Sequence, residues 1–488
     1  MLKYSNFNLI KNNNLFLIVF IIFCANRQIE VIANPNATKT ECILYQNNNL
    51  IKNHELDQTL CPPYPIKQIK KKLTLMFYSA SDNDLHPFAW PTIKQLANGA
   101  NENVHIIVQL NEPGRNKKTQ RYLIEKNKAK LLNPDGQQKL DSGDPHTLID
   151  FCTWAIKNFP ADDYLLDLSD HGSGIIDRNA ARLINPAELF VLNPSNLMLE
   201  LDRSIEFLDF LEKPKKDMSQ EKYRGICFDE TYQSYLTNQK LEFALQAICK
   251  EATQFLDNKK PFKFSILGMD ACLMQMLEFE YLSKFAHILV ASQEVELAWG
   301  WRYDKILKPM EYQTLNYTEL AKHIVKVYQE TYSGITNDFT LSAINLDIID
   351  QLKNNVNKFS ELLIEMLQNQ KDNSVKIIIK KCKSSIAFEE PSYIDLRSFY
   401  ENINKNLDKL YFKNPESENL KTQLSQTIKE GLDILQEIVI ENTSGRNISY
   451  AKGLSIYFPE KRIHNSYNKT NFAQTNQWLT FLMHYVAI

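Results

Sequence analysis

Short apolar runs alternate with helical patterns along the middle of the chain. Each run has the length of a strand buried on both faces of a sheet, and the clearest examples are residues 73–78, 104–110, 262–267 and 287–291. Between them, apolar residues recur at spacings of three and four, which is typical of helices that cover a sheet. The alternation across residues 73–347 therefore predicts an α/β fold with a mainly parallel sheet.

The pattern changes at residue 349. Long helical patterns follow at residues 350–370 and 416–440, and a late strand is expected at residues 453–458. Strands no longer alternate with helices here. We therefore predict a second, smaller, α-rich module over residues 349–488 that packs back against the sheet.

Two polar turns follow strands of the predicted sheet. The first is Asp270-Ala271-Cys272, after the strand at residues 262–267, and a helix is expected over residues 273–281. Open α/β sheets bind ligands at the carboxyl ends of their strands, and the start of a helix favours a thiolate. Cys272 is therefore a candidate nucleophile, although an isolated cysteine is more often a small buried hydrophobe.

The second turn places His171 between Asp170 and Gly172, after a strand that begins near Tyr164. Glycine at position 172 lets the backbone come close to a substrate. A histidine and a cysteine at the ends of neighbouring parallel strands can act as a general base and a nucleophile. We therefore pair His171 with Cys272, whereas His171 alone would be interpreted as a histidine satisfied at a strand end.

The two turns resemble those of the clostripain family of cysteine peptidases, relatives of the caspases, legumains and gingipains. Further segments that resemble the family occur in the same order, at residues 73–85, 144–171, 225–245, 341–347, 393–396 and 453–459. The resemblance implies a caspase-like α/β/α sandwich as a catalytic domain over residues 70–348. It also implies an endopeptidase that cuts protein or peptide substrates through a thioester on Cys272, with His171 as acid and base.

The resemblance also implies an oxyanion site and a specificity pocket. The backbone N–H groups of Gly172 and Cys272 would form the oxyanion site. Asp270 matches an acidic family position that is associated with basic side chains, so cleavage after Arg or Lys is expected. A carboxylate near a thiolate raises the pKa of the thiol, which is a cost to a peptidase unless the carboxylate is used. The alternative interpretation of Asp270 is an aspartate in a strand-end turn or a helix cap.

Glu294 and Trp301 match the S-x-E and G-W positions of the family and are expected to contact substrate. The proline–glycine pair that usually precedes this Gly-Trp is replaced by Ala298 and Trp299. Because of this departure, the resemblance does not determine the wall of the pocket or the substrate side chain that the pocket prefers. Of the two tryptophans, we expect one to line the pocket and one to serve packing.

A long insertion, residues 175–224, separates the two turns. Insertions beside an active site are usually functional or mobile, and in the family this region commonly carries a self-cleavage site. The resemblance therefore implies processing into two chains, with Arg178 and Arg182 as the preferred sites. Both lie close to His171 and precede an amphipathic helix expected at residues 197–211. The alternative is that these arginines are solvated loop charges.

The composition excludes some classes of function. Hydrophobic residues make up 44% of the chain and the formal net charge is −2, so no basic excess indicates a nucleic-acid partner. No pair of histidines has the spacing of metal ligands, and no acidic loop has the EF-hand pattern. Neither a metal nor a cofactor is therefore expected from the residues, and calcium is implied by the family resemblance alone.

The first residues have the pattern of an export signal. Lys3 and Lys11 precede an apolar run at residues 15–24 that is too short to span a bilayer comfortably. We predict a signal peptide over residues 1–33, an irregular leader over residues 34–69, and a protein that is secreted or held in the periplasm or cell envelope. No stable membrane insertion is expected after removal of the signal, and the alternative is an uncleaved anchor.

Cysteine usage fits an exported protein with a free thiol. The sequence has eight cysteines, and removal of the signal with Cys24 leaves an odd number, which indicates at least one unpaired thiol. Cys152 and Cys249 lie on apolar helix faces and are expected in the core. Cys42 and Cys61 lie in the leader, where they are candidates for a disulfide.

Two other functions remain open at this point. One is a catalytically degenerate protein of the same fold that binds peptides without cutting them. The other is a peptide ligase, which shares the thioester and differs in the group that attacks it. In each case we expect a monomer, which for a self-cleaving peptidase would consist of two chains held together by the sheet.

Overall fold

The computed structural model describes residues 68–132, 138–176, 186–203, 225–256, 260–313, 315–413 and 418–487. It also describes the backbone of the short strands β1 (Ile21–Cys24), β2 (Arg27–Ala33), β3 (Cys42–Gln46), β4 (Asp57–Leu60), β10 (Arg182–Leu183) and β13 (Leu208–Asp209). Most of the predicted signal and leader, with Cys61, falls outside these residues. Among the helices that are described, none has the length and apolar character needed to cross a membrane.

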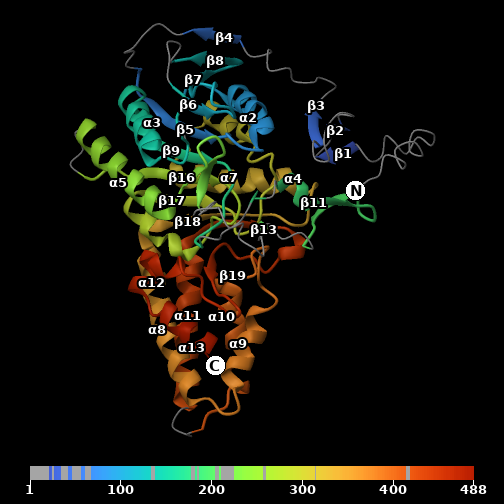
Figure 1. The fold of residues 1–488 in the computed structure, drawn as a ribbon, viewed down its shortest axis with the longest axis vertical. Coiled ribbons are helices and arrows are strands. Elements are labelled where there is room, and N and C mark those ends of the chain that lie inside the picture. The colour runs from blue at the N-terminus through green and yellow to red at the C-terminus, as the bar shows by residue number, and fades with distance from the viewer. Residues whose placement is uncertain are drawn as a thin grey trace, which may run out of the picture.

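A ten-stranded mixed sheet forms the centre of the molecule (Figure 1). In spatial order its strands are β20 (Val439–Ser444), β18 (Thr340–Asn345), β17 (Ala286–Ala291), β16 (Phe264–Asp270), β9 (Ala161–Ser169), β5 (Lys71–Ala80), β6 (Val104–Asn111), β7 (Gln120–Glu125), β8 (Lys128–Leu131) and β4. The five strands from β17 to β6 are mutually parallel, whereas β18, β20 and β7 pair antiparallel with their neighbours. The predicted mainly parallel sheet is therefore confirmed.

Helices cover the sheet on both sides, as expected for an α/β/α sandwich (Figure 1). On one side α3 (Pro145–Asn158) packs against α5 (Asn238–Phe255). On the other, α2 (His86–Gly99) packs on α6 (Tyr303–Leu307), which contacts α7 (Tyr317–Tyr332). The inner strands are buried along their length, since β6 and β16 have no exposed residue, which explains their continuous apolar runs.

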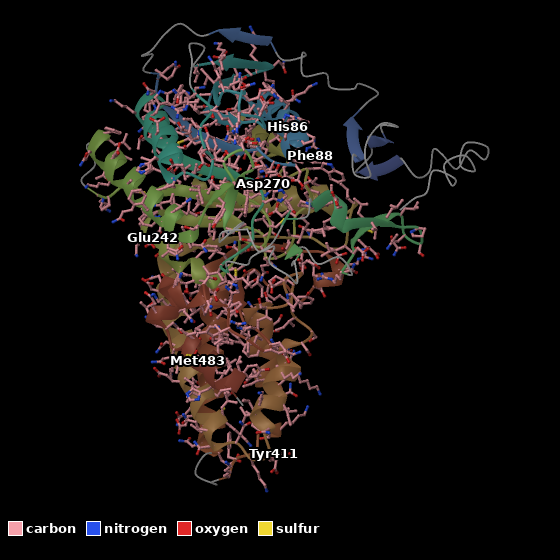
Figure 2. The ribbon with its side chains drawn as sticks, viewed as in Figure 1. His86, Phe88, Glu242, Asp270, Tyr411 and Met483 are labelled. Carbon is pink, nitrogen blue, oxygen red and sulfur yellow. The ribbon has the colours of Figure 1, made fainter. Side chains whose placement is uncertain are left out.

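Apart from β20, which returns to the edge of the sheet, most of the chain after β18 forms a helical module that extends away from the sheet (Figure 1). Its α-helices are α8 (Ile349–Asn369), α9 (Ser374–Lys383), α10 (Leu396–Asn404), α11 (Asn419–Ile438), the short α12 (Asn471–Thr475) and α13 (Trp478–Ala487). Figure 2 shows Asp270 in the sheet region and Tyr411 at the far tip of the module. A small antiparallel pair, β19 (Tyr393–Asp395) and β21 (Ser455–Tyr457), lies between the two regions and bonds to the segment after β16.

The helix predicted over residues 197–211 is wrong. Phe190–Asn193 and Met198–Leu201 instead form the hairpin β11–β12. Asparagine side chains build its turn, because Asn193 accepts the N–H of Ser195 at 2.8 Å and Asn196 accepts the N–H of Met198 at 2.9 Å. Such local bonds compete with a helix, so the apolar spacing was misleading here.

The helix predicted from residue 273 is also wrong at its start. The helical segment is the 3₁₀ helix η2 (Leu277–Lys284), and Leu273 has a left-handed φ of 63°. The backbone of this stretch is bonded to the loop after β17, because Gln275 donates its N–H to the carbonyl of Ser292 at 2.9 Å. Cys272 therefore does not begin an α-helix, and the helix-dipole argument for its thiolate does not apply.

Candidate active site

The register of the sheet brings the histidine and cysteine turns together. Asp270 at the end of β16 is paired with Ser169 at the end of β9, so each turn leaves the sheet at the same level. A Cβ atom built at Gly172 would overlap the carbonyl oxygen of Cys272. Only glycine fits at this contact without displacement of the backbone. The structure thus places His171 and Cys272 on two turns that touch.

His171 is buried and hydrogen-bonded to a residue that the sequence argument missed. Its Nε2 lies 2.6 Å from a carboxylate oxygen of Asp84, and Nδ1 has no hydrogen-bond partner in the described part of the chain. Burial opposes the charged ring, but the hydrogen bond and charge of Asp84 outweigh it, so the pKa of His171 is raised. Asp84 lies in the polar turn after β5, at the same edge of the sheet, which was the available signal.

Asp170 stabilises the histidine turn from the inside. It accepts a hydrogen bond from Asn83 Nδ2 at 2.6 Å and another from the backbone N–H of Phe228. Its carboxyl is buried, which raises the pKa of Asp170 to about 7. These hydrogen bonds connect the turns after β5 and β9 with β14 (Ile226–Asp229). They therefore fix the turn that carries His171.

The thiol of Cys272 is buried and hydrogen-bonded to the backbone. Only 2% of the residue is exposed, and Sγ accepts a hydrogen bond from the backbone N–H of Glu296 at 3.3 Å. Burial raises the pKa of the Cys272 thiol well above its ordinary value, and the carboxyls of Glu296, Glu294 and Asp270 raise it further. Since Nδ1 of His171 is unpartnered and Nε2 faces Asp84, no hydrogen bond joins the imidazole to the thiol.

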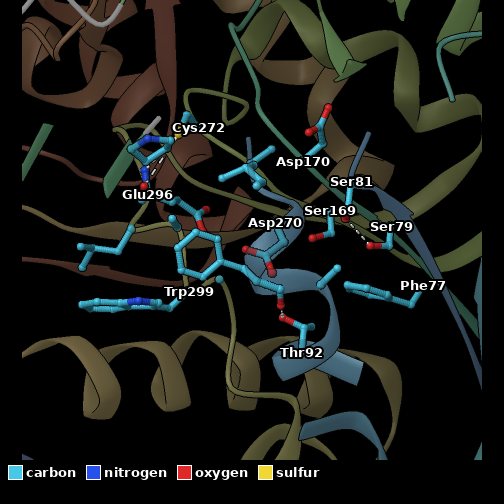
Figure 3. A pocket seen from close by; sticks show the side chains of 18 residues that line it. Phe77, Ser79, Ser81, Thr92, Ser169, Asp170, Asp270, Cys272, Glu296 and Trp299 are labelled. Carbon is cyan, nitrogen blue, oxygen red and sulfur yellow. Dashed lines mark hydrogen bonds between the residues drawn. The ribbon is translucent and has the colours of Figure 1, made fainter. Parts of the chain in front are cut away.

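A pocket with about 520 Å³ of empty space, part of it open to solvent, lies beside the thiol. Figure 3 shows Asp270 between Cys272 and Glu296 on one side and Ser79, Ser81 and Phe77 on the other. Asp270 is held in place by the backbone N–H of Trp301 at 3.0 Å and the hydroxyl of Tyr303 at 2.8 Å. The predicted specificity residue therefore lines a pocket that also includes the candidate nucleophile.

Three buried carboxyls gather at this pocket: Asp270 and Glu296, which line it, and Asp167, which does not. Tyr303 contacts Asp270 and also Asp167, at 2.6 Å, although a hydroxyl has one proton to donate. Burial and then the charge of Asp270 raise the pKa of Asp167 to about 8, and the same two causes raise the pKa of Glu296 well above its ordinary value. No lysine or arginine in the described residues forms an ion pair with these three carboxyls. The cluster therefore combines acidic groups whose full ionisation lacks a partner cation.

The structure separates the roles of the two tryptophans. Trp299 lines the pocket, whereas the Trp301 ring is buried against Gly268 and stacks on Tyr303 at 6.3 Å between ring centroids. Gly300 between them has a φ of 60° and passes directly over the carboxylate of Asp270. The proposed substrate contact of Trp301 remains a prediction, and its located contribution is the N–H bonded to Asp270.

Glu294, the other predicted contact, lies outside the residues that line the pocket. It is fully buried, and one of its oxygens is 3.1 Å from the guanidinium of Arg203. The other oxygen accepts the backbone N–H groups of Val295 at 2.9 Å and Glu389 at 3.0 Å. A role of Glu294 in substrate binding remains a prediction.

The insertion reaches the site through Pro186, the first residue of α4 (Pro186–Leu189), which lines the pocket. Of the predicted cleavage sites, Arg182 is described as backbone in β10, paired with β13, and Arg178 falls outside the described residues. Within the described chain no His, Cys, Asp and Glu side chains converge in threes as metal ligands.

Comparisons with known proteins indicate the family of this chain. A family model described as the clostripain family matches residues 77–185 and 213–485. Clostripain from Hathewaya histolytica is 24% identical over 273 residues, which cover 49% of this chain and 42% of that protein. The chain thus aligns with less than half the length of this relative.

Solved structures share the fold. A secreted C11 cysteine protease from Bacteroides thetaiotaomicron, in complex with an irreversible peptide inhibitor, superposes with a TM-score of 0.54 at 17% identity, covering 84% of this chain and 99% of that one. An inactive zymogen C11 protease from Parabacteroides distasonis gives a TM-score of 0.50 at 16% identity, covering 86% and 99%. At these identities the likeness concerns the fold.

Proposed function

Because the chain belongs to the clostripain family, we propose that it is a cysteine endopeptidase in which Cys272 is the nucleophile and His171 the general base. The observation that carries the proposal is the contact between the two turns, with Gly172 seated on the carbonyl of Cys272 beside an acidic pocket. A nucleophile, a base and a substrate pocket then share one edge of the sheet, as acyl transfer requires.

The bonds around His171 indicate which nitrogen takes the proton. Asp84 occupies Nε2, so the free Nδ1 is the one that accepts the thiol proton of Cys272. The thiolate then attacks the scissile carbonyl, and the imidazolium returns the proton to the leaving amine. Water hydrolyses the thioester and regenerates the thiol. Before the first step, the hydrogen bond from the N–H of Glu296 to Sγ of Cys272 has to break. We propose that substrate binding breaks it.

We infer that the enzyme prefers substrates in which Arg or Lys immediately precedes the cleaved peptide bond. Asp270 faces the pocket, and burial followed by the charge of Asp270 raises the pKa values of its neighbours Asp167 and Glu296. A substrate cation in the pocket would favour the ionised carboxylates and would itself be bound by them. The backbone N–H groups of Gly172 and Cys272 are our candidates for the oxyanion site, because Gly172 has no side chain to block it.

Export and self-cleavage are also part of the proposal. One structural relative is described as secreted, which supports the predicted signal over residues 1–33. Pro186 in the pocket wall supports an insertion that restricts access until it is cut, with Arg178 and Arg182 as the sites. Purified wild type should then run as two bands, and Cys272→Ala as one. A fully active single-chain wild type would exclude self-cleavage as the switch.

The nucleophile is tested by turnover of peptides ending in arginine, using Cys272→Ala, His171→Ala and Cys249→Ala. The first two should be inactive and folded, because both residues lie beyond the strand ends. Cys249 is a buried thiol on α5, and its alanine variant should keep kcat and lose stability. Substantial activity in Cys272→Ala would exclude the assignment.

A peptide-binding protein without activity is the second candidate. It is favoured by the buried thiol, which has no hydrogen bond to His171, and by the replacement of the usual proline–glycine pair with Ala298-Trp299. An iodoacetamide probe separates the two candidates. Labelling of Cys272 that is accelerated by a bound arginine peptide supports the peptidase, whereas a thiol that stays inert with peptide bound supports the binding protein.

A further inference from the structure

Arg203 connects the insertion to the core of the catalytic domain. It follows β12, at the end of a described part of the insertion. Its guanidinium lies 3.1 Å from Glu294, 3.5 Å from Glu389 and 3.8 Å from Asp338. These acidic residues come from three separate segments, so a single side chain of the insertion joins all of them.

The ion pair with Glu294 is the shortest of these contacts. The Glu294 side chain is fully buried, whereas 40% of the Arg203 side chain is exposed. Burial raises the pKa of Glu294, and the adjacent charge of Arg203 opposes this rise without cancelling it. A buried carboxylate without a cation is strongly destabilising, so the loop that holds Glu294 depends on Arg203 for its charge balance.

The same loop holds the segment that carries the nucleophile. The N–H of Leu273 donates to the carbonyl of Glu294 at 3.2 Å, and the N–H of Glu296 donates to Sγ of Cys272 at 3.3 Å. Leu273 has a φ of 63°, a left-handed conformation that is unfavourable for leucine and persists only where its surroundings impose it. The position of the Cys272 turn therefore depends on the position of Glu294.

We propose that Arg203 is a positioning residue for the nucleophile and that it acts through its ion pair with Glu294. The inference rests on the proposed function, in which Cys272 attacks the substrate. The matched family ranges end at residue 185 and resume at 213, so Arg203 lies in the segment between them. This chain thus uses its own insertion to hold the loop against the cysteine turn.

The inference limits how self-cleavage can activate the enzyme. A cut after Arg178 or Arg182 leaves Arg203 on the fragment that carries Cys272. A cut beyond Arg203 leaves it on the fragment with His171. Arg203 is then still held by its ion pairs, and Leu199 still donates its N–H to the carbonyl of Ile335 at 2.8 Å. In both cases the insertion stays bound as part of the site and is not released.

The test compares Arg203→Met with Arg203→Lys in the full chain, on a fluorogenic peptide ending in arginine. Methionine keeps an apolar stem and removes the charge, so kcat should fall on the order of 10²-fold, the loss typical of a nucleophile displaced by about 1 Å. KM should change little, because Asp270 is retained. Lysine restores the charge and should recover a large part of the lost kcat, which a purely steric role would not predict.

Arg397→Met is the matched control. Arg397 also pairs with a glutamate, Glu401, at 3.2 Å, but on α10 of the helical module, where both side chains are about one third exposed, so its loss should leave kcat unchanged. The inference is overturned if Arg203→Met keeps the wild-type kcat or loses no more than Arg397→Met. The failures are distinguishable, since activity retained by Cys272→Ala removes the proposed nucleophile, whereas activity retained by Arg203→Met removes only its positioning.

A second variant covers the case in which Arg203→Met does not fold. Arg203→Met combined with Glu294→Gln removes both charges of the shortest ion pair, so Glu294 is no longer a buried carboxylate without its cation. This folded double variant should still show a lowered kcat, because the contact between the insertion and the loop is lost. A wild-type kcat in the double variant overturns the inference.

Discussion

The carboxyl end of the sheet and the core of the helical module are equally buried but chemically opposite. At the sheet, Asp167, Asp270 and Glu296 share a site in which no described lysine or arginine pairs with them, and burial raises their pKa values. In the module, the Phe458 ring packs 4.9 Å from Tyr485 and 5.4 Å from Trp478, measured between centroids. Aromatic burial is favourable, whereas buried carboxyls are costly. A site of this kind persists because packing elsewhere stabilises the chain.

The two regions also touch. Ser455 of β21 donates its N–H to the carbonyl of Gln275 at 3.0 Å, and Tyr457 donates its N–H to Glu278 at 2.8 Å. Both acceptors lie in the segment that follows Cys272. The module therefore supports the nucleophile segment directly and, through its aromatic core, the stability of the whole chain.

Phe458→Ala should separate stability from catalysis. Removal of this fully buried ring should lower the free energy of unfolding by about 3–5 kcal/mol, with little change in kcat at low temperature. Denaturant unfolding and turnover measure the two effects. Phe255→Ala, which removes a ring that is 43% exposed on α5, is the control and should cost much less. Equal losses in the two variants would contradict the role given to the aromatic core.

Asp270→Asn should have the opposite signature. Loss of the charge that faces the pocket should lower kcat/KM for Arg and Lys substrates. The expected decrease corresponds to a loss of about 2–5 kcal/mol of transition-state stabilisation. The free energy of unfolding should not fall, because one costly buried carboxylate has been neutralised. Parallel assays on substrates with neutral side chains provide the control. Equal loss on every substrate would make Asp270 a structural or thiol-tuning residue.

Gly172→Ala tests the contact between the two turns. The added methyl group would overlap the carbonyl of Cys272, so the turns have to move apart and kcat should fall on the order of 10²-fold. Gly114→Ala is the control, since a Cβ there meets nothing closer than 3.7 Å. Its effect should be confined to local stability, because its φ of 111° is unfavourable for alanine. An unchanged kcat in Gly172→Ala would show that the contact is not needed.

The carboxyl cluster should make stability depend on pH. The pKa of Asp167 is raised to about 8 by burial and by Asp270, so the native state keeps a proton that the unfolded chain releases near pH ~4. The free energy of unfolding should therefore fall as the pH rises through this window, by up to about 1.4 kcal/mol per pH unit. Denaturant titrations across the window measure the slope. Asp167→Asn should reduce the slope, to which Asp170, with a pKa of about 7, still contributes, and an unchanged slope would place the proton on another group.

The strands of the sheet could be predicted from the sequence because their signal is local. A strand that is buried on both faces requires a continuous apolar run, and the runs at residues 73–78 and 287–291 fall within β5 and β17. The turns with His171 and Cys272 could be located for a related reason. Each is a short polar sequence that directly follows such a run, at the edge where parallel strands end together.

Long-range contacts decided the rest. The helical spacing after Cys272 is overridden because Leu273 and Gln275 bond to residues 292–294, and the spacing after Leu197 is overridden by the hairpin β11–β12. Asp84 lies 87 residues from His171 in the sequence, and Arg203 lies 91 residues from Glu294. Such pairs leave no periodic or local pattern, because their proximity is created by strand register and by the path of the insertion. The local sequence therefore determined the strands and the two turns. Only the tertiary structure determined which charged side chains lie next to those turns.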